Sequence, residues 1–181
     1  NEHITAYVDI SQGYSPPTTA QMIVPYLGTA NTSLKPEMGM QYEIGSKGTF
    51  FKNKLSYQVA LFDLQITNKL VNQAIPNTPA GNNETVNVGG QENKGAELVI
   101  AYNMINETKL LSYLRPFVSY TYLNCTYKGY KSDNNNTATT LDYSGKNAVG
   151  VSPQVYNIGL DVALKFGVYL NVTYQSVDKE P

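Results

Sequence analysis

Residues 34–67 read LKPEMGMQYEIGSKGTFFKNKLSYQVALFDLQIT and decide the fold. Apolar side chains occupy every second position at Met38, Met40, Tyr42 and Ile44, with glycine or polar residues between them. A period of two places the two sets on opposite faces of a strand. The polar break at residues 51–54 suits a tight hairpin, after which residues 55–67 return antiparallel. Each strand exceeds the usual length of roughly five to six residues and is close to the 9–11 that cross a bilayer.

The same alternation recurs along the rest of the chain. It is found at residues 4–11, 94–104, 115–127, 154–165 and 168–175. In the fourth of these runs Tyr156, Ile158 and Leu160 alternate with polar or small residues, and in the third we expect Val118 to face opposite to Ser119. The sequence therefore predicts an all-β fold, an antiparallel up-and-down meander of about seven long strands.

The connections between these strands alternate in length. Long polar connections are predicted at residues 13–35, 68–91 and 131–150, and short turns at 51–54, 106–108 and 166–167. A meander with its long loops at one end and tight turns at the other gives this order, as in outer-membrane barrels. A soluble sandwich instead predicts shorter strands and no regular alternation of connection length.

Composition is compatible with an extended β protein and excludes some partners. The chain has 181 residues, of which 41% are hydrophobic and 15% charged, with a net charge of −1. No basic patch or run of like charge is present, so nucleic acid is not an expected partner. The 15 Tyr suit a wet lumen or an aromatic girdle, and also a Tyr-rich soluble sandwich.

No catalytic or metal-binding constellation is visible in the sequence. His3 is the single histidine and Cys125 the single cysteine, so neither a nucleophile with a histidine base nor a cluster of metal ligands is expected. Cys125 is interpreted as a small residue within a strand. We expect no enzymatic activity, no metal and no cofactor.

Four carboxylates lie within predicted strands on the less apolar face: Asp9, Glu43, Glu97 and Asp161. If the apolar face meets lipid, these groups face an aqueous lumen and avoid the large penalty of a charge in hydrocarbon. The alternative is a solvated face with no specific partner. Asp63 has the parity of Leu61, so either a bulge shifts its facing or that part of the strand packs inward.

Several short segments, in this order, resemble the barrel of TonB-dependent outer-membrane receptors, most closely the siderophore type. They are LKPE at 34–37, YEIG at 42–45, LFD at 61–63, NKGAEL at 93–98, FVSYTY at 117–122, SPQ at 152–154 and NIGL at 157–160. Receptors of this family are closed barrels of about 22 strands with a plugged lumen.

The resemblance implies that residues 1–181 are an interior portion of such a barrel, with no plug domain and no TonB box. It implies active uptake of a scarce nutrient, commonly a ferric siderophore, across the outer membrane of a Gram-negative bacterium. The implied partners are outer-membrane lipid, the rest of the barrel, the plug domain and, through the plug, the TonB complex.

Three loop tyrosines are candidate ligand contacts: Tyr14, Tyr26 and Tyr143. An aromatic ring with a hydroxyl can recognise a metal chelate with little loss of entropy. Loop packing or anchoring in an aromatic girdle is the alternative for each. Two other functions remain open: a passive porin-like or structural barrel, and a secreted β-sandwich binding or adhesion module.

Overall fold

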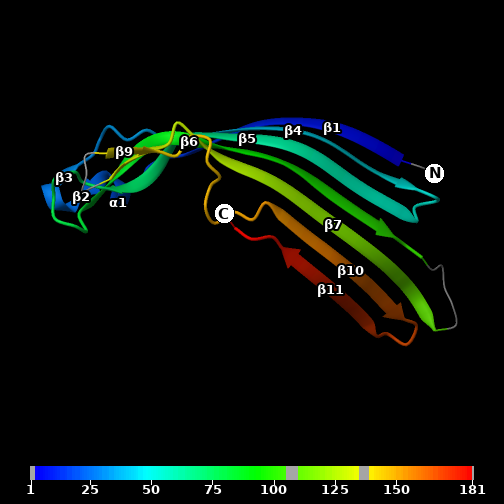
Figure 1. Cartoon of the computed structure of the whole chain (residues 1–181). Helices are drawn as coiled ribbons and strands as arrows, with labels where there is room; N and C mark the ends of the chain where they lie inside the picture. Colours follow the sequence, from blue (N-terminus) through cyan, green and yellow to red (C-terminus); the bar gives the residue numbers. More distant parts are fainter. Residues whose placement is uncertain (1–2, 105–109, 135–138, 181) are drawn as a thin grey trace.

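A single curved sheet of seven antiparallel strands dominates the molecule (Figure 1). The computed structural model describes residues 3–104, 110–134 and 139–180. The strands follow the chain order, which confirms the predicted meander. They are β1 (His3–Ser15), β4 (Glu37–Phe50), β5 (Leu55–Ala74), β6 (Asn83–Tyr102), β7 (Leu111–Lys128), β10 (Gln154–Leu164) and β11 (Tyr169–Val177).

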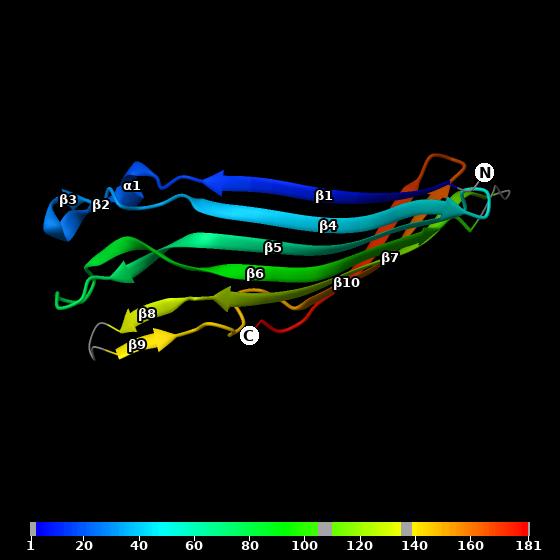
Figure 2. The ribbon, with the colours of Figure 1, turned by 90° about the horizontal axis from the view of Figure 1, so that it is seen from above.

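The two ends of the sheet differ in their connections (Figures 1 and 2). At one end Phe51, Lys52 and Asn53 have positive φ angles and form the predicted tight hairpin between β4 and β5. The opposite end carries α1 (Thr19–Met22), β2 (Ile23–Val24), the 3-10 helix η1 (Pro25–Leu27), β3 (Thr29–Ala30), β8 (Lys131–Asn134) and β9 (Thr139–Asp142). We call these the turn end and the loop end.

The turn predicted at 106–108 lies outside the described residues. No helix in the described part of the chain is long and apolar enough to cross a membrane.

The long connection predicted at residues 68–91 is wrong. β5 continues to Ala74 and β6 begins at Asn83, so only eight residues, 75–82, separate the two strands. The alternation is interrupted because Asn68 takes a left-handed φ of 56°. Gly90 lies so close to β5 that an added Cβ would stand 2.0 Å from the Ile66 carbonyl oxygen. Likewise, the connection at 131–150 contains the β8–β9 pair.

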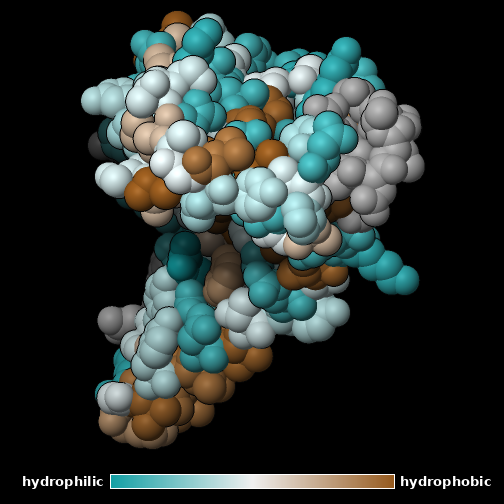
Figure 3. All heavy atoms as spheres, turned by 90° about the vertical axis from the view of Figure 1, so that its left-hand side faces the viewer, coloured by the Kyte–Doolittle hydropathy of each residue, from teal (hydrophilic) through white to brown (hydrophobic). Residues whose placement is uncertain are grey.

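The register lines the apolar side chains up across the strands. One row runs through Val8, Ile44, Leu61, Ala96 and Tyr122. A second row continues across Ile100, Val118, Ile158 and Tyr174, which confirms the expected facing of Val118. All of these side chains belong to one face, the apolar face. In Figure 3, seen from the loop end, hydrophobic residues gather on the strands that extend below the more hydrophilic near surface.

Burial is inverted relative to a water-soluble sheet. Ile44 and Leu61 on the apolar face are 57% and 55% exposed, whereas Ala60 and Asp161 on the opposite, polar face are 5% and 6% exposed. Seen from above, β10 and β11 pass beneath the other strands, so the sheet curls (Figure 2). The burial of Ala60 and Asp161 indicates that their face lies inside the curl. The polar face is therefore the inner one. Among the described residues no second sheet covers either face, which contradicts the sandwich alternative.

Aromatic rings on the polar face lie over glycines of the next strand. The rings of Tyr7, Phe62 and Phe117 cover the glycines directly opposite them, Gly45, Gly95 and Gly159. At each glycine an added Cβ would stand within 2.4 Å of a ring atom. Pairs of this kind fix strand register because a ring fills the space that the glycine leaves.

Asp63 fits neither of the two explanations expected from its parity. The register of β5 is continuous there, and Asp63 lies between Tyr42 and Lys94 on the apolar face. Its carboxylate approaches the Lys94 ammonium at 3.8 Å. On β5 and β6 the apolar residues end at this level and polar or charged residues follow towards the loop end, whereas the apolar face continues on β1 and β4 to Tyr14 and Met38.

Candidate functional site

All four predicted carboxylates belong to the polar face. Glu43 accepts hydrogen bonds from the Tyr7 hydroxyl at 2.7 Å and from Gln41 Nε2 at 3.1 Å. Asp9 is the cross-strand neighbour of Glu43, and both Asp9 and Glu97 are exposed to solvent. A solvated inner face is thus compatible with these positions, and their orientation towards a barrel lumen stays a prediction.

Asp161 lies at the centre of a polar network on β7, β10 and β11. Its Oδ1 accepts from the Tyr169 hydroxyl at 2.7 Å and from Asn171 Nδ2 at 2.6 Å. Its Oδ2 lies 3.3 Å from Arg115 Nη1. Three strands are therefore joined through one carboxylate, which argues for a structural role rather than a site left open for a ligand.

The segment between β1 and β4 is fixed onto the extended β5–β6 hairpin. Asn31 Nδ2 donates to the Thr85 carbonyl at 3.2 Å. The Asn87 amide accepts from the Lys35 N–H at 2.7 Å and donates to the Lys35 carbonyl at 2.9 Å. These bonds hold the connection in one place, so that it can form one wall of a pocket.

A pocket of about 470 Å³ lies between this segment and the hairpin. We call it the loop-end pocket. Its walls are Ala20, Gln21, Ile23, Pro25, Tyr26, Leu70, Val71, Asn72, Gly81, Asn82, Asn83, Glu84 and Thr85.

The polar groups of the loop-end pocket are amides, hydroxyls and one carboxylate, and five apolar residues line it beside them. Glu84 is the single charged residue among those that line it. Amide groups both donate and accept hydrogen bonds, and a carboxylate accepts from N–H groups or attracts a cation. The pocket therefore suits a polar ligand that is neutral or positively charged better than it suits an anion.

The three predicted tyrosines lie at three separate places. Tyr26 lines the loop-end pocket. Tyr143 packs edge-on against Tyr130, with ring centroids 5.6 Å apart, and Tyr130 in turn contacts Tyr127 at 4.8 Å. Burial in this cluster raises the pKa of the Tyr130 hydroxyl.

Tyr14 does not lie in a loop as predicted. It belongs to β1, opposite Met38, and its place in the register puts it on the apolar face. Anchoring in an aromatic girdle stays a prediction for Tyr14. The asparagines that fix and line the pocket were missed, and the Asn-rich composition of the two connections was the available signal.

Other candidate chemistry is sparse. In the part of the chain that the structure describes, no three His, Cys, Asp or Glu side chains converge as a metal site. Cys125 is buried in β7, where Gln91 Nε2 donates to its Sγ at 2.9 Å. Its position within a strand confirms the prediction.

Comparison with solved structures shows the fold. The copper transporter OprC superposes with a TM-score of 0.66 at 14% identity, over 96% of this chain and 23% of OprC. The siderophore receptor PiuA from Acinetobacter baumannii gives a TM-score of 0.63 at 19% identity, over 97% of this chain and 24% of PiuA. The chain thus spans about a quarter of the length of each. No curated protein matches its sequence.

Family membership follows from the sequence as a whole. The family model described as TonB dependent receptor-like, beta-barrel matches residues 1–181. The seven-stranded meander, the exposed apolar face and the difference between the two ends agree with that match. The chain belongs to the TonB-dependent receptor β-barrel family.

Proposed function

We propose that this chain forms part of the barrel wall of an active outer-membrane transporter. The observation that carries the proposal is the inverted sheet, with a continuous apolar face exposed and a polar face inside the curl. On β7 the apolar row from Leu114 to Tyr122 extends about 26 Å at about 3.3 Å per residue, which a strand tilt of about 35–45° reduces to about 20 Å along the membrane normal. The apolar band of a membrane barrel is of the same scale, about 25 Å.

The open edges of the sheet require further strands. β1 and β11 are the outermost strands of the sheet. Backbone groups left unpaired in hydrocarbon cost several kcal/mol each. A sheet with two unpaired edge strands is therefore not stable in a bilayer without further strands. We infer that residues 1–181 are one portion of a larger barrel, whose plug domain couples transport to the TonB complex. The protein would be a receptor in the outer membrane of a Gram-negative bacterium, without enzymatic activity.

The transported ligand would be a metal chelate, and a ferric siderophore is our first candidate. Two structural neighbours described as a copper transporter and a siderophore receptor support metal uptake as the class. The loop-end pocket supplies Tyr26 and amide groups for a chelate of small size. Tyr143 would contribute through the tyrosine cluster with Tyr127 and Tyr130.

Uptake of a radiolabelled ferric chelate by cells that carry the complete receptor tests this proposal. We expect saturable uptake that stops when the proton-motive force is collapsed or TonB is deleted. Tyr26→Ala should weaken binding about tenfold, the loss of one well-placed aromatic contact, whereas Tyr14→Ala is the matched control and should bind normally. Uptake that persists without TonB would show a passive pore instead.

A further inference from the structure

The apolar face has a groove where its rows reach the first charged side chains. The groove has a volume of about 640 Å³. Ala96 forms its floor, because this small side chain lies between Leu61 and Tyr122 in the register. Ile44 also borders the groove, and the polar residues Asp63 and Lys94 lie at its loop-end rim.

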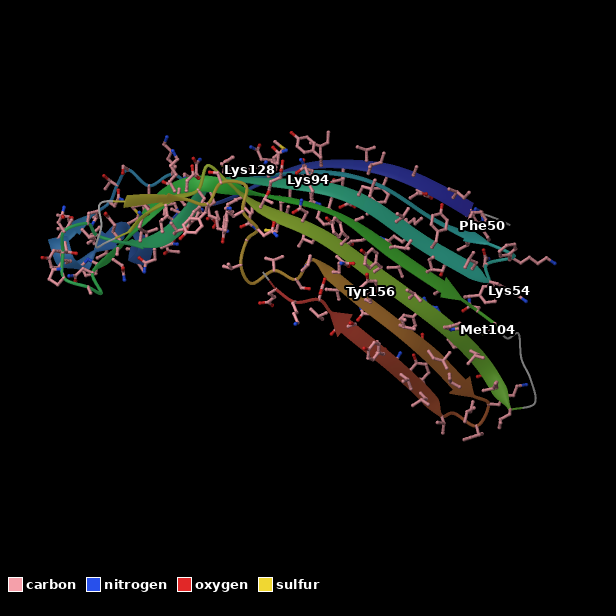
Figure 4. All side chains as sticks on the ribbon, viewed as in Figure 1. Phe50, Lys54, Lys94, Met104, Lys128 and Tyr156 are labelled. Carbon is pink, nitrogen blue, oxygen red and sulfur yellow. The ribbon has the colours of Figure 1, made fainter. Side chains whose placement is uncertain are left out.

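A charged cluster lies on the same face beside the groove and consists of Asp63, Glu92, Lys94 and Lys128. Glu92 Oε1 binds Lys94 Nζ and Glu92 Oε2 binds Lys128 Nζ, both at 2.9 Å. One carboxylate thus holds two ammonium groups next to each other. Figure 4 shows both lysines close together towards the loop end, far from Phe50 and Lys54 at the turn end.

The exposure of these side chains determines which charge faces outward. The Lys94 and Lys128 side chains are 54% and 57% exposed, whereas that of Glu92 is 17% exposed. The carboxylate lies beneath and the two ammonium groups lie above it. Each ammonium has three N–H donors, so donors remain for an anion at the surface of a cluster that is neutral overall.

One acceptor in the cluster is without a partner. Asp63 Oδ1 is buried and receives no hydrogen bond from any described residue, while Gln65 Nε2 donates to Oδ2 at 3.1 Å. A buried acceptor left unpaired costs free energy, but Asp63 Oδ1 has almost no exposed surface through which a ligand could reach it. The rim therefore offers a ligand two exposed ammonium groups next to an apolar groove.

We propose that the groove and the charged cluster bind one lipid of the surrounding bilayer, with a headgroup that carries a phosphate. An acyl chain lies in the groove over Ala96, and the phosphate accepts hydrogen bonds from Lys94 and Lys128. This inference rests on the proposed function, since the apolar face must meet a bilayer. Continuity of the groove with the exposed apolar rows favours a lipid over a protein partner.

Native mass spectrometry of the complete receptor in detergent, titrated with phosphatidylglycerol, tests the proposal. The wild type should retain one phosphatidylglycerol at least about ten times more tightly than the Lys94→Gln/Lys128→Gln variant, which loses two charge-assisted contacts. Ala96→Phe should also release the lipid because the ring fills the groove. Lys47→Gln, on the polar face, is the matched control and should bind like the wild type.

Two further ligands show whether binding needs the headgroup as well as the acyl chains, and whether a free phosphate ester can replace the lipid. Diacylglycerol with the same chains should be retained poorly, and glycerol 3-phosphate should not displace the bound lipid. Equal retention of phosphatidylglycerol by all variants, or displacement by glycerol 3-phosphate, would overturn the proposal. The proposed function fails differently: the receptor would not insert into lipid vesicles or resist protease there, whichever lipid is supplied.

Discussion

The sheet exposes residues of its apolar face and buries residues of its polar face, which is the reverse of a sheet in a water-soluble protein. Ile44 and Leu61 are exposed on one face, and small or hydrogen-bonded residues such as Ala60 and Asp161 are buried on the other. The hydrophobic effect acts on area removed from water, so an exposed apolar face is stable only where another apolar medium covers it. The difference between the faces therefore agrees with the proposed contact of one face with lipid and of the other with water.

The largest expected effect comes from placing the same charge on either face of β5. Val59→Lys puts an ammonium on the apolar face, and we expect it to destabilise the receptor in lipid vesicles by about 2–4 kcal/mol, as for a lysine at the middle of a bilayer. Gln58→Lys, one residue away on the polar face, should change the free energy of unfolding by less than about 0.5 kcal/mol. Denaturant titration of the receptor in vesicles measures both, and equal costs would remove the distinction between the faces.

A smaller effect is expected from filling the space under an aromatic ring. In Gly95→Ala the new Cβ would stand 2.4 Å from both a Phe62 ring atom and the Tyr122 carbonyl oxygen, so the ring and the backbone must move. We expect a loss of about 1–2 kcal/mol, typical of overpacking.

Gly39→Ala is the control for that substitution. Gly39 lies on the same polar face, and its added Cβ meets no atom closer than 3.7 Å. Its unfolding midpoint should match that of the wild type. If both alanine variants behave alike, the ring does not fix the register.

The smallest expected effect is a difference in denaturation midpoint between alanine variants of two carboxylates on the polar face. Asp161→Ala leaves Arg115, Tyr169 and Asn171 without their shared acceptor, so the denaturation midpoint should fall measurably. Asp9→Ala removes a carboxylate that is exposed at the edge strand, and the midpoint should stay unchanged. Equal midpoints for the two variants would mean that the inner face is uniformly solvated and that the network contributes nothing.

Alternation explains which parts of the fold the sequence predicts. Where side chains follow a period of two, as at Met38 to Ile44 and Tyr156 to Leu160, the strands and their facing were predicted because each face meets one medium. Residues 68–91 were misassigned because Asn68 and Gly90 interrupt the period while the backbone pairing continues.

The loop end was less predictable for a physical reason. The loop-end pocket depends on hydrogen bonds between segments far apart in the chain, such as Asn31 with Thr85 and Asn87 with Lys35. No local pattern encodes such contacts, so Tyr26 was found as a loop aromatic while its amide neighbours were missed. Tyr14 was misplaced because Pro16 and Pro17 made the strand seem to end early, although β1 extends to Ser15.

A cysteine scan of residues 56–62 on β5 tests most directly which medium covers each face. Each single cysteine, in the complete receptor with Cys125 replaced by Ala, would be spin-labelled in lipid vesicles. The accessibility of each label to oxygen and to a water-soluble nickel chelate would then be measured by power saturation. We predict high oxygen and low nickel access at positions 57, 59 and 61, and reduced oxygen access at 56, 58, 60 and 62. Access without a period of two, or with lipid contact at the even positions, would contradict a bilayer-facing apolar surface.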